Sequence, residues 1–174
     1  MSTAWYFAYG SNMATATLRG RRGIEFHRAV PACASGWRLV FDKPPLIAIG
    51  ESFANILPDP QAEVLGVLYE IAAADLAHID LTEGVLVGNY RRIAIPVMPL
   101  TNADGPVAAY TLTCDRCDPV LRPSQRYLEL LIAGAIEHGL PEDYVARLRT
   151  VPTCAESPEA AELRATIEQF LRRA

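Results

Sequence analysis

The chain has 174 residues, of which 51% are hydrophobic and 21% are charged, and its formal net charge is -4. This composition is ordinary for a globular protein, and the length suits one domain that buries about two-thirds of its unfolded surface. The acidic balance gives no electrostatic case for a nucleic-acid partner, and no apolar run approaches the ~20 residues of a membrane span. We therefore expect a single domain over residues 1–174, located in the cytoplasm, with neither nucleic acid nor membrane as a partner.

Short apolar runs separated by Gly, Pro and Ser fill the first two-thirds of the chain, a pattern typical of strands and turns. We predict strands over residues 4–9, 37–41, 64–71, 90–98 and 107–114, and short helices over residues 14–22 and 73–81. The segment 42–52 contains Pro44-Pro45 and is expected to be an irregular loop. Gly66 marks a position where another backbone or a ligand can approach closely. Asn102-Ala103-Asp104-Gly105 is a hairpin signal between the last two strands.

The last third of the chain has helical periodicity instead. Ser124 can cap a helix that runs to about His138, and Gly139 suits the position after its end. A second helix is predicted from Pro141 through Arg149. The final helix is expected over residues 157–173, with a buried stripe of Leu163, Ile167, Phe170 and Leu171. Strands followed by helices indicate an α+β domain.

The first candidate site is the loop Tyr9-Gly10-Ser11-Asn12, where the first strand ends. Such a loop offers consecutive N–H donors, a hydroxyl and an amide to an anion or a polarised carbonyl. It equally suits a strand-to-helix turn in which Ser11 or Asn12 only caps the helix. It matches neither a serine-hydrolase motif nor a phosphate-binding loop. On its own, the loop leaves both interpretations open.

The second candidate is Glu83, because apolar residues flank it in the sequence: Leu81, Val85, Leu86 and Val87. If these neighbours surround the carboxylate, they desolvate it, which suits a proton-transfer catalyst. A glutamate near a helix end is also commonly exposed and inert. Asp80 is the competing carboxylate, and we expect it to cap or brace the turn.

Other polar residues give weaker signals. The spacing of the three histidines indicates neither a metal site nor a catalytic triad: His27, His78 and His138. We therefore expect no bound metal. Three arginines form a local basic cluster that we interpret as a solvated helix end: Arg19, Arg21 and Arg22. Cys114 and Cys117 form a C-x-x-C pair, but Pro119 and Pro123 follow, so a loop position is favoured over a thioredoxin-like helix start or a zinc site.

Together, the strand, loop and glutamate resemble the gamma-glutamylcyclotransferase family, also called the AIG2-like family. The run Tyr6-Phe7-Ala8-Tyr9-Gly10-Ser11-Asn12-Met13 is similar to the family's substrate-binding motif, an apolar strand followed by Tyr-Gly-Ser-Asn. The pattern around the family's catalytic glutamate is matched by Asp80, Glu83, Gly84, Val85, Gly88 and Tyr90. The resemblance extends over about residues 4–152, but the stretch 43–56 and the final helix match nothing specific.

The resemblance implies an α+β fold, a small mixed β-barrel of about six strands with surrounding helices. It implies an intramolecular acyl transfer in which a gamma-glutamyl amide closes to 5-oxoproline and releases the attached amine. Glu83 would be the general acid and base, and no cofactor is implied. The substrate-binding residues would be Tyr6, Phe7, Ala8, Tyr9, Gly10, Ser11, Asn12, Tyr90 and Tyr127. The expected partner is a small gamma-glutamyl compound, and the protein is expected to be a monomer or homodimer.

Two other classes of function remain open from the sequence. One is a non-catalytic module that keeps the pocket to bind a small amino-acid derivative. The other is a thiol-redox protein that uses Cys114 and Cys117. The Tyr-Gly-Ser-Asn loop also differs from the Gly-Tyr-Gly-Ser-Leu form typical of glutathione-specific relatives, which makes that substrate a weaker expectation.

Overall fold

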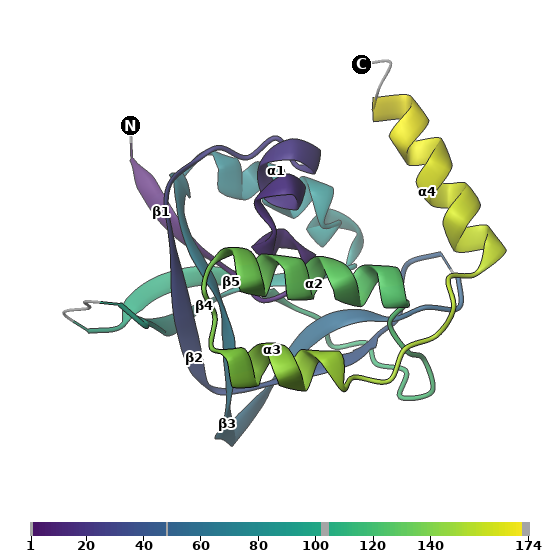
Figure 1. Ribbon diagram of the computed structural model, residues 1–174. Coiled ribbons are helices and arrows are strands. Elements are labelled where there is room, and N and C mark those ends of the chain that lie inside the picture. The colour runs from purple at the N-terminus through teal and green to yellow at the C-terminus, as the bar shows by residue number, and fades with distance from the viewer. Residues whose placement is uncertain (1, 48, 102–104, 172–174) are drawn as a thin grey trace.

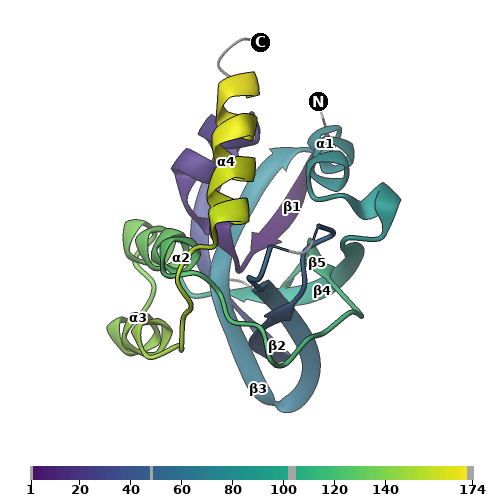
Figure 2. The same ribbon diagram turned by 90° about the vertical axis from the view of Figure 1, so that its right-hand side faces the viewer.

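Five strands among the described residues close into a barrel in the order β1-β3-β2-β4-β5 (Figures 1 and 2). The computed structural model describes residues 2–47, 49–101 and 105–171. The strands are β1 (Thr3–Ala8), β2 (Phe26–Lys43), β3 (Phe53–Ala72), β4 (Arg91–Pro99) and β5 (Val107–Thr113). β1 lies antiparallel to β3 and parallel to β5, so the barrel is mixed. The predicted α+β class and mixed barrel are confirmed, with five strands instead of about six.

The strands β2 and β3 are much longer than predicted, at 18 and 20 residues. They form one antiparallel hairpin whose register shifts between Ser35 and Trp37, where Gly36 has a φ of +83°. Such an irregularity bends a strand without ending it, so the same two strands continue around the barrel. Pro31 and Pro58 lie inside these strands, and proline argues against a strand in any pattern-based prediction. Because these two strands continue through their irregularities, five strands close the barrel where about six were expected.

The strands β4 and β5 form the second hairpin, with Arg91 opposite Thr113 and Val97 opposite Val107. Each predicted end of these two strands lies within one residue of the observed end. Most of the predicted hairpin turn, Asn102-Ala103-Asp104, lies outside the described residues.

Helices and short helical segments cover the outside of the barrel. They are η1 (Ser11–Met13), η2 (Ala16–Arg21), α1 (Asp75–Thr82), η3 (Val85–Val87), α2 (Gln125–Glu137), α3 (Glu142–Arg149) and α4 (Pro158–Leu171). The predicted cap is present on α2, because the Ser124 side chain accepts a hydrogen bond from the Tyr127 amide. The side chains of Ile167, Phe170 and Leu171 and the residues 172–173 lie outside the described part of the chain.

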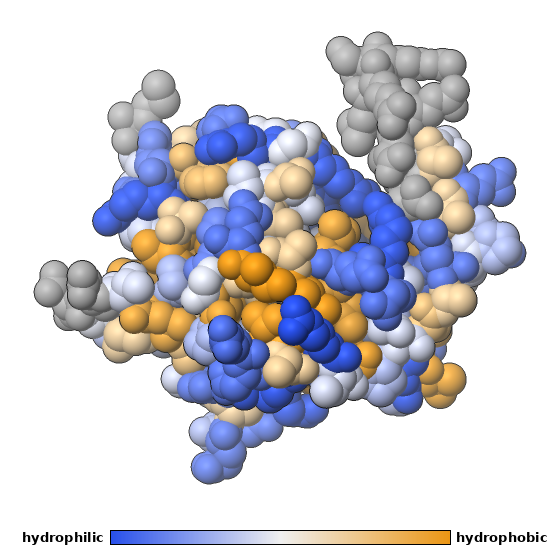
Figure 3. Space-filling model, in the orientation of Figure 1, coloured by the Kyte–Doolittle hydropathy of each residue, from blue (hydrophilic) through white to orange (hydrophobic). Residues whose placement is uncertain are grey.

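The views agree on how these helices are placed. α2 and α3 lie side by side on one side of the barrel, whereas α4 extends away from the body of the molecule (Figures 1 and 2). Hydrophobic side chains reach the surface around α2, within a face that is otherwise largely hydrophilic (Figure 3). In the described residues, no helix is both long and apolar enough to cross a membrane.

Two glycines allow the close packing that positions the loop after β1. A Cβ on Gly66 would lie 2.3 Å from the Ala8 carbonyl oxygen, so the expected close backbone approach is present here. A Cβ on Gly134 would lie 2.5 Å from the Ala14 nitrogen, so α2 rests directly on the chain that follows the loop. The Tyr69 hydroxyl donates to the Met13 carbonyl oxygen at 2.6 Å and fixes the same segment from the barrel side.

Candidate active site

A small cavity of about 40 Å³ lies beside the loop that follows β1. Its walls come from β1, this loop, the start of β3, the end of α1, β5 and α2. The lining residues are Tyr6, Tyr9, Gly10, Ser11, Asn12, Ala54, Glu83, Tyr90, Leu112 and Tyr127. The barrel therefore brings Glu83 and the loop together, although 71 residues separate Asn12 from Glu83 in the chain.

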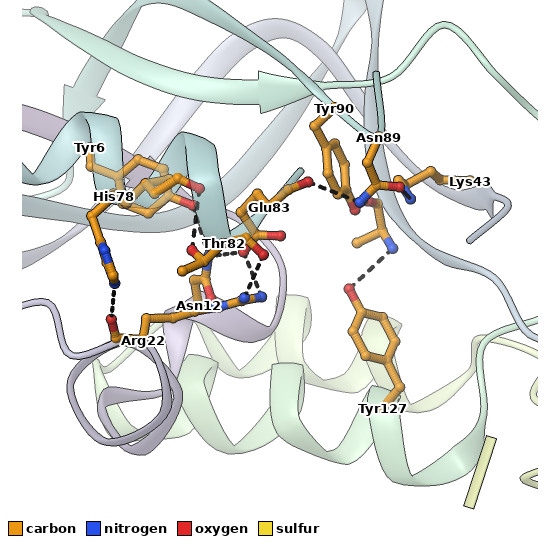
Figure 4. Close-up of polar contacts among 12 residues, drawn as sticks. Tyr6, Asn12, Arg22, Lys43, His78, Thr82, Glu83, Asn89, Tyr90 and Tyr127 are labelled. Atoms are coloured by element: carbon orange, nitrogen blue, oxygen red, sulfur yellow. Dashed lines mark hydrogen bonds and ion pairs between the residues drawn. The ribbon is translucent and has the colours of Figure 1, made fainter. Parts of the chain in front are cut away.

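The carboxylate of Glu83 is held by two donors (Figure 4). One oxygen, Oε1, accepts from Asn12 Nδ2 at 2.8 Å and pairs with the Arg22 guanidinium, also at 2.8 Å. Glu83 directly follows α1, and Gly84, with a φ of +70°, ends that helix in the left-handed conformation. Since the Glu83 side chain is 12% exposed, it is largely enclosed but still reaches the cavity.

The environment of Glu83 differs from the expected one. Its apolar sequence neighbours do not surround the carboxylate, because Leu81, Leu86 and Val87 are exposed. Side chains at successive helical positions point in different directions, so apolar flanks in the sequence do not make an apolar pocket. The interpretation of the arginine cluster as a solvated helix end is also wrong for Arg22, which is 18% exposed and contacts the carboxylate.

The loop after β1 presents polar groups beside Glu83. Asn12 Nδ2 donates both to Glu83 and to the Tyr6 hydroxyl, which lies 3.0 Å away. Burial raises the pKa of the Tyr6 phenol, and the negative charge of Glu83 adds to this effect, so the hydroxyl stays neutral. Within the described residues, the amides of Gly10 and Asn12 have no hydrogen-bond acceptor. These N–H groups are available to an oxygen of a ligand.

Two residues of the motif belong to the core instead of the site. Phe7 and Ala8 are fully buried but line neither described cavity. Neighbouring side chains of a strand point to opposite faces, and Phe7 packs where Gly66 leaves room for its ring. We therefore assign Phe7 and Ala8 to packing and correct their assignment to substrate binding.

Two tyrosines that line the cavity, Tyr90 and Tyr127, hold the backbone of Ala54 by hydrogen bonds. Tyr127 accepts from the Ala54 amide at 3.2 Å, and Tyr90 donates to the Ala54 carbonyl at 3.0 Å (Figure 4). Within the described residues, the Tyr127 hydroxyl has no acceptor for its own proton, so a ligand can accept it.

A larger groove of about 410 Å³ adjoins the small cavity and shares four of its lining residues: Ser11, Glu83, Tyr90 and Tyr127. Arginine and lysine side chains meet apolar ones in this outer groove, among them Arg22, Lys43, Leu46, Ile47, Phe53 and Leu163. The two spaces therefore meet at Glu83 and the two tyrosines, with the smaller space on the side of the loop.

Lys43 is a site residue that the sequence did not reveal. Its side chain is 1% exposed, its Nζ donates to Asn89 Oδ1 at 2.7 Å, and it lies 4.4 Å from the Tyr90 ring centre. Asn89 in turn donates to the Glu83 carbonyl oxygen at 2.9 Å. Burial lowers the pKa of Lys43 to about 8. A lysine between Asp42 and Pro44 carries no sequence signal of burial, since tertiary packing alone decides it.

Comparisons with known proteins identify the relatives of this arrangement. A family model described as "AIG2-like family" matches residues 63–148. A gamma-glutamyl cyclotransferase of Aspergillus oryzae is 29% identical over 96% of this chain and 68% of its own length. The gamma-glutamylcyclotransferases of Bos taurus and Homo sapiens are also 29% identical, each over 84% of this chain and 77% of their own.

This match and these relatives confirm the resemblance to the AIG2-like family. Solved structures agree on the fold. A human protein titled uncharacterized superposes with a TM-score of 0.76 at 24% identity, covering 94% of this chain and 98% of that one. A structure titled gamma-glutamyl cyclotransferase gives 0.75, also at 24% identity, covering 99% of this chain and 100% of that one.

Three further charged candidates, Asp80, His78 and His138, lie outside both cavities. Asp80 pairs with Arg92 at 2.9 Å and so braces α1 against β4, in agreement with its expected bracing role. His78 contacts the Arg22 carbonyl oxygen at 2.8 Å, and His138 contacts the Tyr69 hydroxyl at 2.8 Å. These histidines support the backbone around the site but do not line it.

Replacing Tyr127 with phenylalanine is expected to lower kcat/KM about tenfold while preserving the fold. The substitution removes the acceptor of the Ala54 amide and the hydroxyl proton that a ligand could accept, each a hydrogen bond worth about 1 kcal/mol. Steady-state kinetics and thermal unfolding of Tyr127→Phe and Tyr90→Phe would test this. Unchanged affinity and turnover in both variants would mean that the two hydroxyls only form hydrogen bonds to the backbone of Ala54.

The C-x-x-C pair lies in the loop after β5, as predicted. Cys114 is buried and Cys117 exposed, and both are free thiols. Between them, Arg116 reaches Asn89 Oδ1 at 3.3 Å, so this loop borders the outer groove.

The double variant Cys114→Ser/Cys117→Ser is expected to keep its turnover, because neither thiol lines the small cavity or the outer groove. Product release with and without dithiothreitol measures this, with Cys117→Ser alone as the variant that leaves the core untouched. Activity that is lost in a folded double variant, or that switches with dithiothreitol, would reveal a redox control.

Proposed function

We propose that this protein cyclises a gamma-glutamyl amide to 5-oxoproline and releases the attached amine, with Glu83 as general acid and base. The observation that carries the proposal is the shared small cavity, in which Glu83 faces the Tyr9–Asn12 loop. The names of the curated relatives support the same reaction class. The chemistry of the site then assigns each step to a group.

In the proposed reaction, a bond forms between the substrate's α-nitrogen and its γ-carbonyl carbon, and the amide bond to the attached amine breaks. Glu83 takes a proton from the attacking amine and returns it to the leaving amine. Both reacting groups belong to one molecule, so holding the glutamyl chain folded beside Glu83 supplies a large effective molarity. No cofactor is needed for this sequence of proton transfers.

The loop amides would stabilise the charge that develops on the γ-carbonyl oxygen. Gly10 and Asn12 line the same cavity as Glu83, and their N–H groups have no acceptor within the described residues. Donors that are already positioned before the reaction stabilise an oxyanion without reorganisation, and removing one such donor typically costs about 10²–10³ in rate. The scissile bond would then lie at the junction of the two spaces, with the leaving group in the outer groove.

A panel of gamma-glutamyl compounds tests the function directly. The panel should include gamma-glutamyl amino acids, a gamma-glutamyl polyamine, glutathione and a larger gamma-glutamyl metabolite, with 5-oxoproline and the released amine both quantified. We expect equal amounts of the two products from at least one compound. Saturable binding of these compounds without any turnover would instead support a non-catalytic binding module.

The setting of the reaction is part of the proposal. All four cysteines are free thiols, a state that persists in the reducing cytoplasm. We place the protein there, with a small gamma-glutamyl compound as its partner, without nucleic acid or membrane, and as a monomer or homodimer.

A further inference from the structure

The ion pair between Arg22 and Glu83 occupies the position where the reaction needs a free carboxylate. Arg22 NH2 lies 2.8 Å from Glu83 Oε1, and the same oxygen already accepts from Asn12. Both charged side chains are largely enclosed, at 18% and 12% exposed. Enclosing a charge pair is costly unless its geometry is excellent or the pair has a use.

The guanidinium is anchored through NH1 and has an unpaired donor at Nε. Its NH1 group donates to the Thr82 carbonyl oxygen at 2.8 Å, which ties Arg22 to the end of α1. Its Nε is buried and has no hydrogen-bond acceptor within the described residues. Nε and NH2 lie on the same edge, the edge that a carboxylate can engage with two parallel hydrogen bonds. Only NH2 is used, by a single oxygen of Glu83.

We infer that Arg22 binds the α-carboxylate of the gamma-glutamyl substrate. This inference rests on the proposed function, because that function defines the substrate as an α-amino acid at this end. Such a group carries an ammonium and a carboxylate on one carbon, the two charges that complement Glu83 and Arg22. On binding, two new ion pairs replace the one between Arg22 and Glu83. The substrate's carboxylate binds the Nε–NH2 edge of Arg22, and its ammonium binds the oxygen of Glu83 that Arg22 has left.

The exchange leaves the total charge of the site unchanged and fills the open donor on Nε. The NH1 contact to Thr82 keeps the guanidinium near Glu83 throughout. The substrate therefore displaces the cation from the carboxylate and presents its ammonium there in one event. A compound without the α-carboxylate would leave Arg22 on Glu83 and compete poorly for that oxygen.

The test compares two substrates in three proteins. The substrates are the gamma-glutamyl compound that turns over fastest and its 4-aminobutanoyl analogue, which lacks the α-carboxylate and would close to 2-pyrrolidinone. The released amine is common to both and is the quantity measured. The proteins are the wild type, Arg22→Gln and the matched control Arg19→Gln, whose ion pair with Glu25 lies on the surface.

We expect removal of the carboxylate to lower wild-type kcat/KM about 10- to 100-fold, the range of a charge-assisted hydrogen bond. In Arg22→Gln the gamma-glutamyl substrate should lose a similar factor, and the analogue should lose little more. Arg19→Gln should behave as the wild type. Arg22→Gln losing equally on both substrates would overturn the inference while leaving the function intact, whereas no amine release from any gamma-glutamyl compound would overturn the function.

A second variant covers the case in which Arg22→Gln fails to fold. Arg22→Lys keeps the positive charge but cannot bind a carboxylate in a bidentate manner. It should therefore still prefer the gamma-glutamyl substrate to the 4-aminobutanoyl analogue, but by a smaller factor than the wild type. A preference equal to that of the wild type would overturn the role of the Nε–NH2 edge.

Discussion

Replacing Glu83 with glutamine is expected to lower kcat by about two to four orders of magnitude, the range for removal of a general acid–base group. Glutamine keeps the volume of the side chain, and its amide oxygen can still accept from Asn12 and Arg22, the two donors now at 2.8 Å. The variant should therefore fold and bind substrate, but it cannot carry the proton from one nitrogen to the other. Steady-state release of 5-oxoproline and thermal unfolding measure both expectations.

Asp80→Asn is the matched control for this experiment. Asp80 lies three residues before Glu83, carries the same charge, and pairs with Arg92 away from both cavities. Its neutralisation is expected to reduce stability slightly and to leave kcat within a few-fold of the wild type, because exposed or partly exposed ion pairs contribute about 0–1 kcal/mol. A Glu83→Gln protein that keeps more than about a tenth of its turnover would place the proton-transfer group elsewhere.

Local signals in the sequence were enough to place most elements. Strand β1 and the loop after it follow from an apolar run that breaks into Gly-Ser-Asn. The ends of α2 follow from a capping serine at Ser124 and from Gly139, whose φ is +68°. The close approach at Gly66 also follows from the lack of a Cβ in a strand. In each case, a few neighbouring residues decide the structure.

Features that depend on distant packing could not be predicted in the same way. The long β2–β3 hairpin contains prolines that break a strand pattern, and only its pairing across the barrel keeps it continuous. Arg22 was interpreted as part of a solvated helix end, and Lys43 fell in a predicted loop, because nothing near them in the sequence indicates which face they join. The motif gave the location of Glu83, but its polar partners come from η2 and η1 and its cavity from four further elements.

Gly134→Ala is expected to reduce both stability and turnover, although alanine is the better helix former. The new Cβ would lie 2.5 Å from the Ala14 nitrogen and 2.6 Å from the Met13 carbonyl carbon, and both are backbone atoms that cannot swing away. Overpacking of this kind costs about 1–3 kcal/mol, whereas the gain in helix propensity is about 1 kcal/mol. The net result should be a loss of up to about 2 kcal/mol in the free energy of unfolding.

The effect on turnover should be larger than this loss of stability suggests. Met13 directly follows Asn12, the residue that donates to Glu83, so a shift of the loop moves the donor and the loop amides together. A misplacement of about 1 Å at such a site can cost about 10² in rate.

Gly20→Ala is the matched control, because its Cβ would meet nothing within 4 Å and its backbone is not in the left-handed region. It should be as active as the wild type and at least as stable. If Gly134→Ala were as active and as stable as this control, the loop would not depend on α2 for its position. The Tyr9–Asn12 loop would then have to be held in place from the barrel side alone, through the hydrogen bond from the Tyr69 hydroxyl to the Met13 carbonyl oxygen.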